Sequence, residues 1–183
     1  MAEAKRLMPI ILKWEGGYVN NPLDRGGETN KGITLAAWQA FGHNVSEKLV
    51  SVTEGKKTWC NVTKSLYEMT GEQWLEIFKN GYWNRWKADR IIDQSVANIL
   101  VDWVWSSGIH GIKIPQKLLG LQADGTVGEK TLEAVNASEP SAIFAGIKEA
   151  RLEFVKALSA SNPSQACFLS GWKNRINDFN YIP

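Results

Sequence analysis

The segment from Asp93 to Gly108 constrains the fold more than any other part of the chain. The apolar residues on one face of a helix through it are Val96, Ile99, Leu100, Trp103 and Val104. Further apolar residues occupy the other faces, and a helix that is apolar nearly all round must be enclosed by other elements. The sequence therefore predicts a buried central helix that Asp93 caps and Gly108 ends.

Amphipathic patterns elsewhere predict the helices that enclose this one. Residues 7–14 place apolar side chains on one face, and two glycines end that helix directly after Glu15. Further helix starts are predicted after Thr34, after Thr70, after the turn at Asp124–Gly125, at Pro140 and at Pro163. Residues 42–61 lack periodicity and are expected to be irregular. We therefore predict an all-α fold, with at most a small β-hairpin after the first helix.

Composition and charge exclude several classes of function. The chain has 183 residues, of which 44% are hydrophobic, and a formal net charge of +2. It is long enough for a substantial core and lacks the basic surplus of a nucleic-acid-binding protein. The N-terminus has neither a signal-peptide pattern nor a membrane-spanning run, so we expect a protein made in the cytoplasm without stable membrane insertion. We also expect a monomer. Cys60 and Cys167 have no metal-type spacing and are expected to be reduced thiols.

Glu15 is the residue whose position most strongly suggests chemistry. It directly follows an amphipathic helix and stands between Trp14 and a glycine pair, with Tyr18 close behind. The negative end of the helix dipole and the aromatic flanks favour the protonated carboxyl that a general acid requires. Such an acid protonates the leaving oxygen of a glycosidic bond. A solvated glutamate at a helix end is an equally good interpretation of the local pattern.

The polar segment after Glu15 offers candidate partners for it. Asp24 either orients and activates water or bonds the backbone of its own turn. Thr29 and Thr34 either position that water through their hydroxyls or serve a turn and a helix cap, and the cap suits Thr34 well. Glu28 is a second candidate carboxylate, which we expect to face solvent.

Aromatic and hydroxyl side chains suggest how a polysaccharide is held. The chain has nine tryptophans. Trp83 and Trp86 lie at a helix end among polar residues, where they either line a sugar-stacking groove or belong to the core. Tyr18 lies beside Glu15, and Ser107 ends the central helix, so both are candidate substrate-binding residues.

Motifs for other kinds of chemistry are missing from the sequence. It contains no nucleophile elbow, phosphate-binding loop or zinc-binding helix. His43 and His110 are the only histidines, too few for a histidine-based metal site. We therefore expect no metal and no cofactor.

Two blocks of motifs resemble a known enzyme family. The first is E-G-G-Y at Glu15, followed by N-P-L-D-R-G-G-E-T-N-K-G-I-T from Asn21. The second comprises L-L-G-L-Q-A-D-G-T-V-G-E-K-T-L-E-A-V from Leu118, A-R-L-E-F-V-K-A-L from Ala150 and G-W-K-N-R-I from Gly171. In this order they resemble glycoside hydrolase family 108, the N-acetylmuramidases found among phage endolysins and in bacterial genomes, with a C-terminal peptidoglycan-binding region.

The resemblance implies a lysozyme-like helical fold and hydrolysis of the MurNAc–GlcNAc β-1,4 bond of peptidoglycan. It places the catalytic region at residues 1–108 and a helical peptidoglycan-binding region at residues 109–183, packed together as one compact unit. It also implies that Glu15 is the proton donor, and a more distant similarity to phage-type lysozymes adds Asp24 and Thr29. One departure is W-S-S-G at residues 105–108, where relatives often have an asparagine before Ser-Gly.

The expected partner is therefore the glycan strand of peptidoglycan, reached in the cell wall or periplasm after release or export. Two alternatives remain open. A lytic transglycosylase also works with one acid but leaves a 1,6-anhydro product. A non-catalytic peptidoglycan-binding protein would use the C-terminal block while Glu15 is merely structural.

Overall fold

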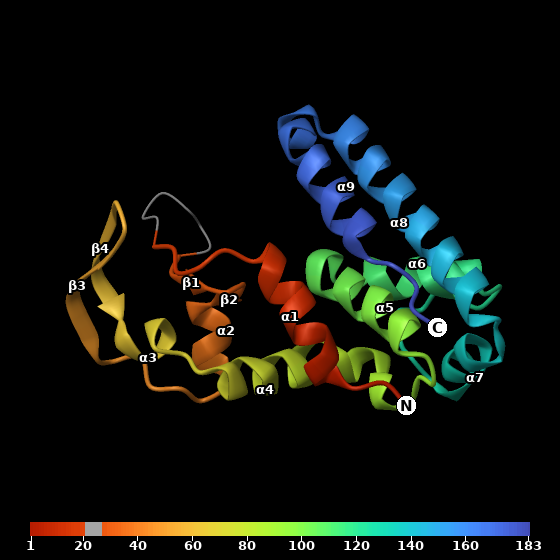
Figure 1. Ribbon diagram of the computed structural model, residues 1–183, viewed down its shortest axis with the longest axis horizontal. Coiled ribbons are helices and arrows are strands. Elements are labelled where there is room, and N and C mark those ends of the chain that lie inside the picture. Colours follow the sequence, from red (N-terminus) through yellow and green to blue (C-terminus); the bar gives the residue numbers. More distant parts are fainter. Residues whose placement is uncertain (21–26) are drawn as a thin grey trace. The chain divides into compact units, whose positions relative to one another are not determined.

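The computed structural model describes residues 1–20 and 27–183 of the chain (Figure 1). The chain forms two compact units. The hairpin unit comprises Met8–Lys79, and the helical unit comprises Met1–Leu7 together with Asn80–Pro183. This division falls at a different place from the boundary at residue 108 that the sequence suggests, because α5 (Gln94–Ser107) packs on α6 (His110–Leu118) and α8 (Pro140–Ser161).

The hairpin unit alternates short helices with two small antiparallel sheets. After α1 (Ala4–Trp14), β1 (Thr29–Asn30) pairs with β2 (Ile33–Thr34), which leads into α2 (Leu35–Ala40). A longer hairpin follows, made of β3 (Lys48–Glu54) and β4 (Lys57–Thr63), and then α3 (Lys64–Tyr67) and α4 (Gly71–Gly81) complete the order. The small sheet after α1 confirms the predicted minor hairpin.

Buried tryptophans fix the elements of the hairpin unit to one another. Trp38 of α2 donates from Nε1 to Oγ of Ser65 at 2.9 Å, and Trp74 of α4 donates to the carbonyl oxygen of Lys31 at 2.9 Å. Asn30 of β1 donates to the carbonyl of Leu66 in α3 at 2.8 Å. The indoles of Trp38 and Trp74 are fully buried. Their hydrogen bonds therefore satisfy N–H donors that burial would otherwise leave unpaired.

The β3–β4 hairpin corrects the prediction of an irregular segment over residues 42–61. Its register pairs Ser51 with Cys60 and Val52 with Trp59, and Gly55 adopts a positive φ of 58° in the turn. Most side chains of both strands are exposed. Strands that leave most of their side chains exposed do not need the apolar–polar alternation by which strands are usually found, and this explains the error.

The helical unit is built around α5, as the sequence predicts. Its residues from Ser95 to Val104 are all buried, and the side chain of Asp93 accepts from the amide of Val96 at 2.8 Å to cap it. Helix α6 approaches α5 very closely at Gly111, where a Cβ atom would lie 2.5 Å from the backbone nitrogen of Val104. The predominantly helical fold is confirmed.

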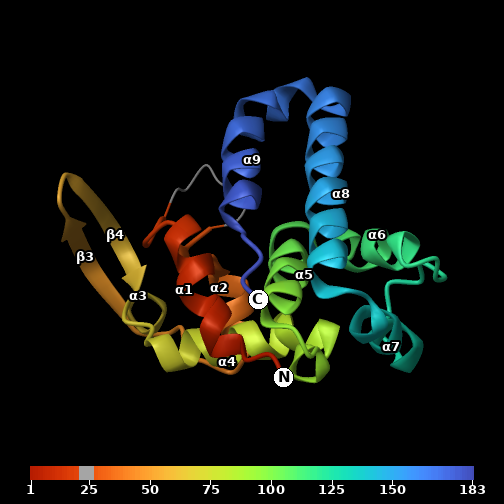
Figure 2. The same cartoon turned by 45° about the vertical axis from the view of Figure 1, so that its right-hand side comes forward.

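The C-terminal part of the helical unit is an antiparallel helix pair. Helix α8 and helix α9 (Leu169–Asp178) run side by side and are joined by the 3-10 helix η3 (Pro163–Phe168) (Figure 2). The shorter elements η1 (Trp83–Trp86), η2 (Ala88–Arg90) and α7 (Glu129–Ala137) complete the unit. Over the described residues, no helix is both long enough and apolar enough to cross a membrane.

A buried ion cluster joins α5 to α8 and α9. Oδ2 of Asp102 accepts from Nη2 of Arg151 at 2.6 Å, and Oδ1 accepts from Nη2 of Arg175 at 2.6 Å. Asp102 is 1% exposed and Arg151 2%. Burial alone would raise the pKa of Asp102, but the charges of the two arginines outweigh it and hold that pKa below its ordinary value.

Candidate active site

Glu15 continues the last turn of α1. Its amide donates to the carbonyl of Ile11 at 3.1 Å, and its side chain is half-buried. Gly16 and Gly17 follow with exposed backbone, and a Cβ atom at Gly17 would lie 4.0 Å from Oε2 of Glu54 in β3. Glu15 therefore stands where the sequence predicts it, at a helix end that opens into a glycine turn.

A two-bond bridge brings Thr29 next to the segment that follows Glu15. The amide of Val19 donates to the carbonyl of Thr29 at 2.8 Å, and the amide of Thr29 donates back to Val19 at 2.8 Å. Thr29 is half-buried in β1. The predicted partner Asp24 belongs to the segment between the two bridged residues and lies outside the described part of the chain.

Thr34 acts as a helix cap. Its Oγ1 accepts from the amide of Ala37 at 3.2 Å, at the start of α2. The capping role that the sequence offered for this residue is confirmed, and the hydroxyl oxygen is engaged with the backbone of the protein.

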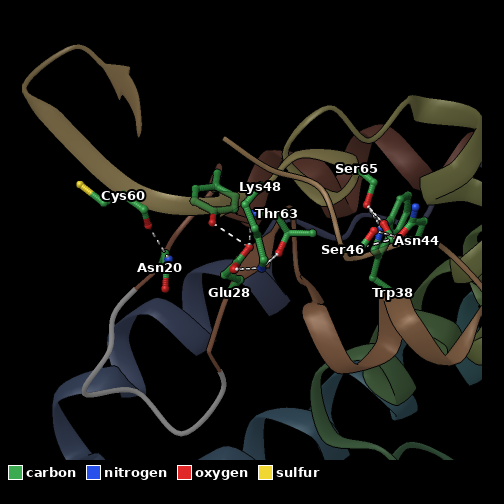
Figure 3. A network of polar contacts seen from close by, with 10 residues as sticks. Asn20, Glu28, Trp38, Asn44, Ser46, Lys48, Cys60, Thr63 and Ser65 are labelled. Atoms are coloured by element: carbon green, nitrogen blue, oxygen red, sulfur yellow. Dashed lines mark hydrogen bonds and ion pairs between the residues drawn. The ribbon is translucent and has the colours of Figure 1, made fainter. Parts of the chain in front are cut away.

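Glu28 is the centre of a hydrogen-bond network and does not face solvent as we expected. It is 8% exposed. Its Oε2 accepts from the hydroxyl of Tyr18 at 2.9 Å and from the amide of Thr63 at 2.8 Å, while Oε1 accepts from Nζ of Lys48 at 3.0 Å (Figure 3). Lys48 also donates to the hydroxyl of Thr63. The reason for the error is that Thr63 and Lys48 come from β4 and β3, far along the chain.

The electrostatics of this network favour a charged Glu28. Burial alone would raise the pKa of Glu28, but the hydrogen bonds from Thr63, Lys48 and Tyr18 outweigh burial and lower the pKa. The pKa of Tyr18 is raised by burial and by its bond to the Glu28 carboxylate. Glu28 therefore supports the site by tying the segment after Glu15 to the β3–β4 hairpin.

Tyr18 is buried, which corrects its prediction as a substrate-binding residue. It is 3% exposed, and its ring meets Trp59 and Tyr67 edge-to-face with centroid distances of 5.4 Å each. Those two outer rings are half-buried, and the hydroxyl of Tyr67 donates to Oε1 of Glu54 at 2.7 Å. Sequence reasoning missed Trp59, Tyr67 and Glu54, because only the unpredicted hairpin brings them to the glycine turn after Glu15.

Trp83 and Trp86 are core residues of the helical unit. Both are fully buried, with Nε1 of Trp83 donating to Oδ1 of Asp89 at 2.8 Å and Nε1 of Trp86 donating to the carbonyl of Gly111 at 3.1 Å. Neither ring has a face free to stack on a sugar, so the structure corrects the proposed groove and supports the alternative of a core role.

Ser107 and the two cysteines lie at accessible positions. Ser107 is half-buried at the end of α5 and lines a cavity of about 100 Å³ in the helical unit. Cys60 and Cys167 are free thiols and both are exposed. Within residues 1–20 and 27–183, no group of three or more His, Cys, Asp and Glu side chains is placed to hold a metal ion.

Comparisons with known proteins cover almost the whole chain. The family model described as Glycosyl hydrolase 108 matches residues 8–108, and the model described as Predicted Peptidoglycan domain matches residues 110–177. The solved structure of Brucella abortus SagA is 29% identical in sequence with a TM-score of 0.66, over 96% of this chain and 94% of that one. No curated protein matches the chain.

Proposed function

Since the chain belongs to the glycosyl hydrolase 108 family, we propose that it hydrolyses the β-1,4 bond between MurNAc and GlcNAc with Glu15 as the general acid. The chain is a glycoside hydrolase that acts on peptidoglycan. The exact bond and the identity of the acid are the proposal. Glu15 protonates the leaving oxygen, and Asp24, with Thr29, places the attacking water.

The arrangement of the backbone around Glu15 is the observation that supports this assignment. The acid directly follows α1, and the Val19–Thr29 bridge begins four residues later in the chain, with its two residues on either side of the segment that contains Asp24. An acid, a second carboxylate and a hydroxyl are the groups that protonation of the leaving oxygen and delivery of water require. The Glu28 network supports this arrangement, since it anchors Tyr18 to the β3–β4 hairpin.

The half-buried rings of Trp59 and Tyr67 are the aromatic residues of the hairpin unit that we propose for substrate contact. Both lie against Tyr18, directly after the glycine turn. Apolar faces of pyranose rings pack well on aromatic rings, which are rigid and carry polar edges. The helical region of residues 110–177 would hold the cell wall while the hairpin unit cleaves it.

Product analysis tests the reaction. The purified protein should digest isolated peptidoglycan into muropeptides that end in reducing MurNAc, identified by mass spectrometry. Products with 1,6-anhydro ends would instead establish a lytic transglycosylase. Retention of the protein on the wall without any released fragment would establish a binding protein.

A pair of matched variants tests the acid. Glu15→Gln should lower cleavage at least 100-fold, because a positioned general acid contributes about 10²–10⁴-fold to rate. Binding to whole peptidoglycan should be nearly unchanged. Glu76→Gln, which removes an exposed carboxylate from α4 of the same unit, serves as the control and should cleave like the wild type. Normal cleavage by Glu15→Gln would overturn the assignment.

A further inference from the structure

A small cavity in the helical unit brings together three segments that are far apart in the sequence. It has a volume of about 100 Å³ and lies among the C-terminal end of α5, α8 and α9. Ser106 and Ser107 come from W-S-S-G, Arg151 from A-R-L-E-F and Arg175 from G-W-K-N-R. The fold thus collects on one cavity three motifs to which the proposed cleavage reaction assigns no catalytic group.

The polar side of this cavity is rich in donors. Nη2 of Arg151 donates to Oδ2 of Asp102 at 2.6 Å and to Oγ of Ser106 at 3.0 Å. The other oxygen of Asp102, Oδ1, accepts from Nη2 of Arg175 at 2.6 Å. Both oxygens of the Asp102 carboxylate therefore accept hydrogen bonds from guanidinium groups.

Within the described part of the chain, one nitrogen of the Arg151 guanidinium lacks a hydrogen-bond acceptor. Its Nη1 is buried, and among the described residues nothing accepts a hydrogen bond from it. A buried donor of a charged group that lacks an acceptor costs at least about 1–3 kcal/mol, so such an atom calls for a specific explanation. The guanidinium also lies over the ring of Phe179, 5.8 Å from its centroid, but an aromatic face is a weaker acceptor than an oxygen. Because Arg151 lines the adjoining cavity, an acceptor bound there would supply a partner, and an anion suits the charge of the donor better than a neutral group.

The remaining lining of the cavity is apolar and limits the size of that anion. Phe154 and Leu158 of α8 and Trp172 of α9 form this part. Sites for drug-sized ligands have volumes of about 300–1,000 Å³, so a cavity of about 100 Å³ does not hold a sugar ring. It suits a carboxylate with one short apolar substituent.

We propose that this cavity is a carboxylate-binding site for the anionic ends of peptidoglycan. The carboxylate accepts from Nη1 of Arg151 and from the hydroxyl of Ser107, while a methyl substituent packs against Phe154, Leu158 and Trp172. Peptidoglycan carries this chemistry at the C-terminal D-alanine of a stem peptide and at the lactyl group of a muramic acid without a peptide. Only this choice of source rests on the proposed function; the chemistry of the site rests on the cavity.

Binding of small probes to the full chain tests the site. The probes are N-acetyl-D-alanyl-D-alanine, its C-terminal amide and N-acetylmuramic acid, titrated while the indole NMR signal of Trp172 is followed. We expect a saturable shift with at least one of the two acids and at least tenfold weaker binding of the amide. The stronger of the two acids identifies the source. Saturable binding of the amide as tight as that of the dipeptide, or no saturable shift with either acid, would overturn the proposal.

Three variants locate the binding. Arg151→Lys should weaken binding of the better acid at least tenfold, provided that circular dichroism shows a folded protein. Leu158→Asp places a negative charge in the half-buried lining of the cavity and should do the same without disturbing the ion cluster. Ala157→Asp adds the same charge to an exposed position of α8 outside the cavity and should bind within about twofold of the wild type. Equal binding by Leu158→Asp and Ala157→Asp would show that the probe binds elsewhere.

The test separates this proposal from the proposed function. Free probes contain no glycosidic bond to cleave, so their binding does not depend on Glu15. Binding of the probes by a protein that releases no fragments would leave the carboxylate site standing and overturn the muramidase proposal. Cleavage of peptidoglycan by a protein that binds neither acid would support the muramidase proposal and overturn the carboxylate site.

Discussion

Glu28→Gln should destabilise the hairpin unit at neutral pH. The substitution keeps the shape of the side chain but replaces an acceptor-only carboxylate, bonded by Tyr18, Thr63 and Lys48, with an amide that has one donor end. If that end replaces Oε2, it meets the fixed amide of Thr63. If it replaces Oε1, it meets the ammonium group of Lys48, so one contact is lost in either orientation.

The second orientation is cheaper, because the side chain of Lys48 is 33% exposed and can turn to water. Losing that partly exposed ion pair costs up to about 1 kcal/mol. The bonds from Tyr18 and Thr63 change from charge-assisted to neutral, which removes about 1 kcal/mol each. We therefore expect the free energy of unfolding to fall by about 2–3 kcal/mol at pH 7.

The loss should depend on pH in a definite direction. The pKa of Glu28 is lowered in the folded protein, so its contribution is complete above the unfolded pKa of about 4.3. It disappears as the pH falls through the folded pKa. The wild type and Glu28→Gln should therefore differ most at pH 7, and the difference should shrink as the pH falls below about 4.

Urea unfolding followed by tryptophan fluorescence measures this difference, and hydrogen exchange of the Thr63 amide reports the same loss locally. Glu54→Gln is the matched control, since it removes an exposed carboxylate of β3 that has a bond from the hydroxyl of Tyr67, and its stability should change little. A Glu28→Gln protein as stable as the wild type at pH 7, or a deficit that is the same at pH 3, would refute the reasoning.

Two further substitutions test the helical unit by urea unfolding. Asp102→Asn should cost about 3–5 kcal/mol, because it leaves the buried Arg151 without its carboxylate; a loss below about 1 kcal/mol would contradict that account. Gly111→Ala should cost at least about 1–3 kcal/mol, since its Cβ would lie 2.5 Å from the backbone of Val104. Gly146→Ala in α8, where the nearest atom is a flexible Leu118 methyl at 3.3 Å, should be far milder, and equal effects would show that α6 can move away from α5.

The parts of the fold that depend on neighbouring residues were predictable. The caps of α4 and α5 are examples: Thr70 and Gln73 bond each other's backbone amides, and Asp93 bonds the amide of Val96. Such bonds join residues three positions apart, so they are visible as local patterns. The burial of α5 was predictable for a related reason, because its apolar residues surround the helix.

Contacts between distant segments were not predictable from local patterns. The acceptors and donors around Glu28 and the rings around Tyr18 come together only through the β3–β4 hairpin, whose exposed strands carry no apolar alternation. Trp83 and Trp86 show the same limit. An aromatic residue among polar neighbours has the same local sequence pattern whether it lines a groove or packs in a core. For the site, the position of Glu15 at the end of α1 was predictable, and the roles of Glu15, Asp24 and Thr29 stay predictions.

The two thiols give the protein a built-in pair of labelling positions. Cys60 lies on β4 in the hairpin unit and Cys167 on η3 in the helical unit, and these exposed residues are the only two cysteines of the sequence. A maleimide donor and acceptor can therefore be attached to different units without any substitution. Energy transfer between the dyes would then report how the separation of the units changes when the enzyme meets the cell wall.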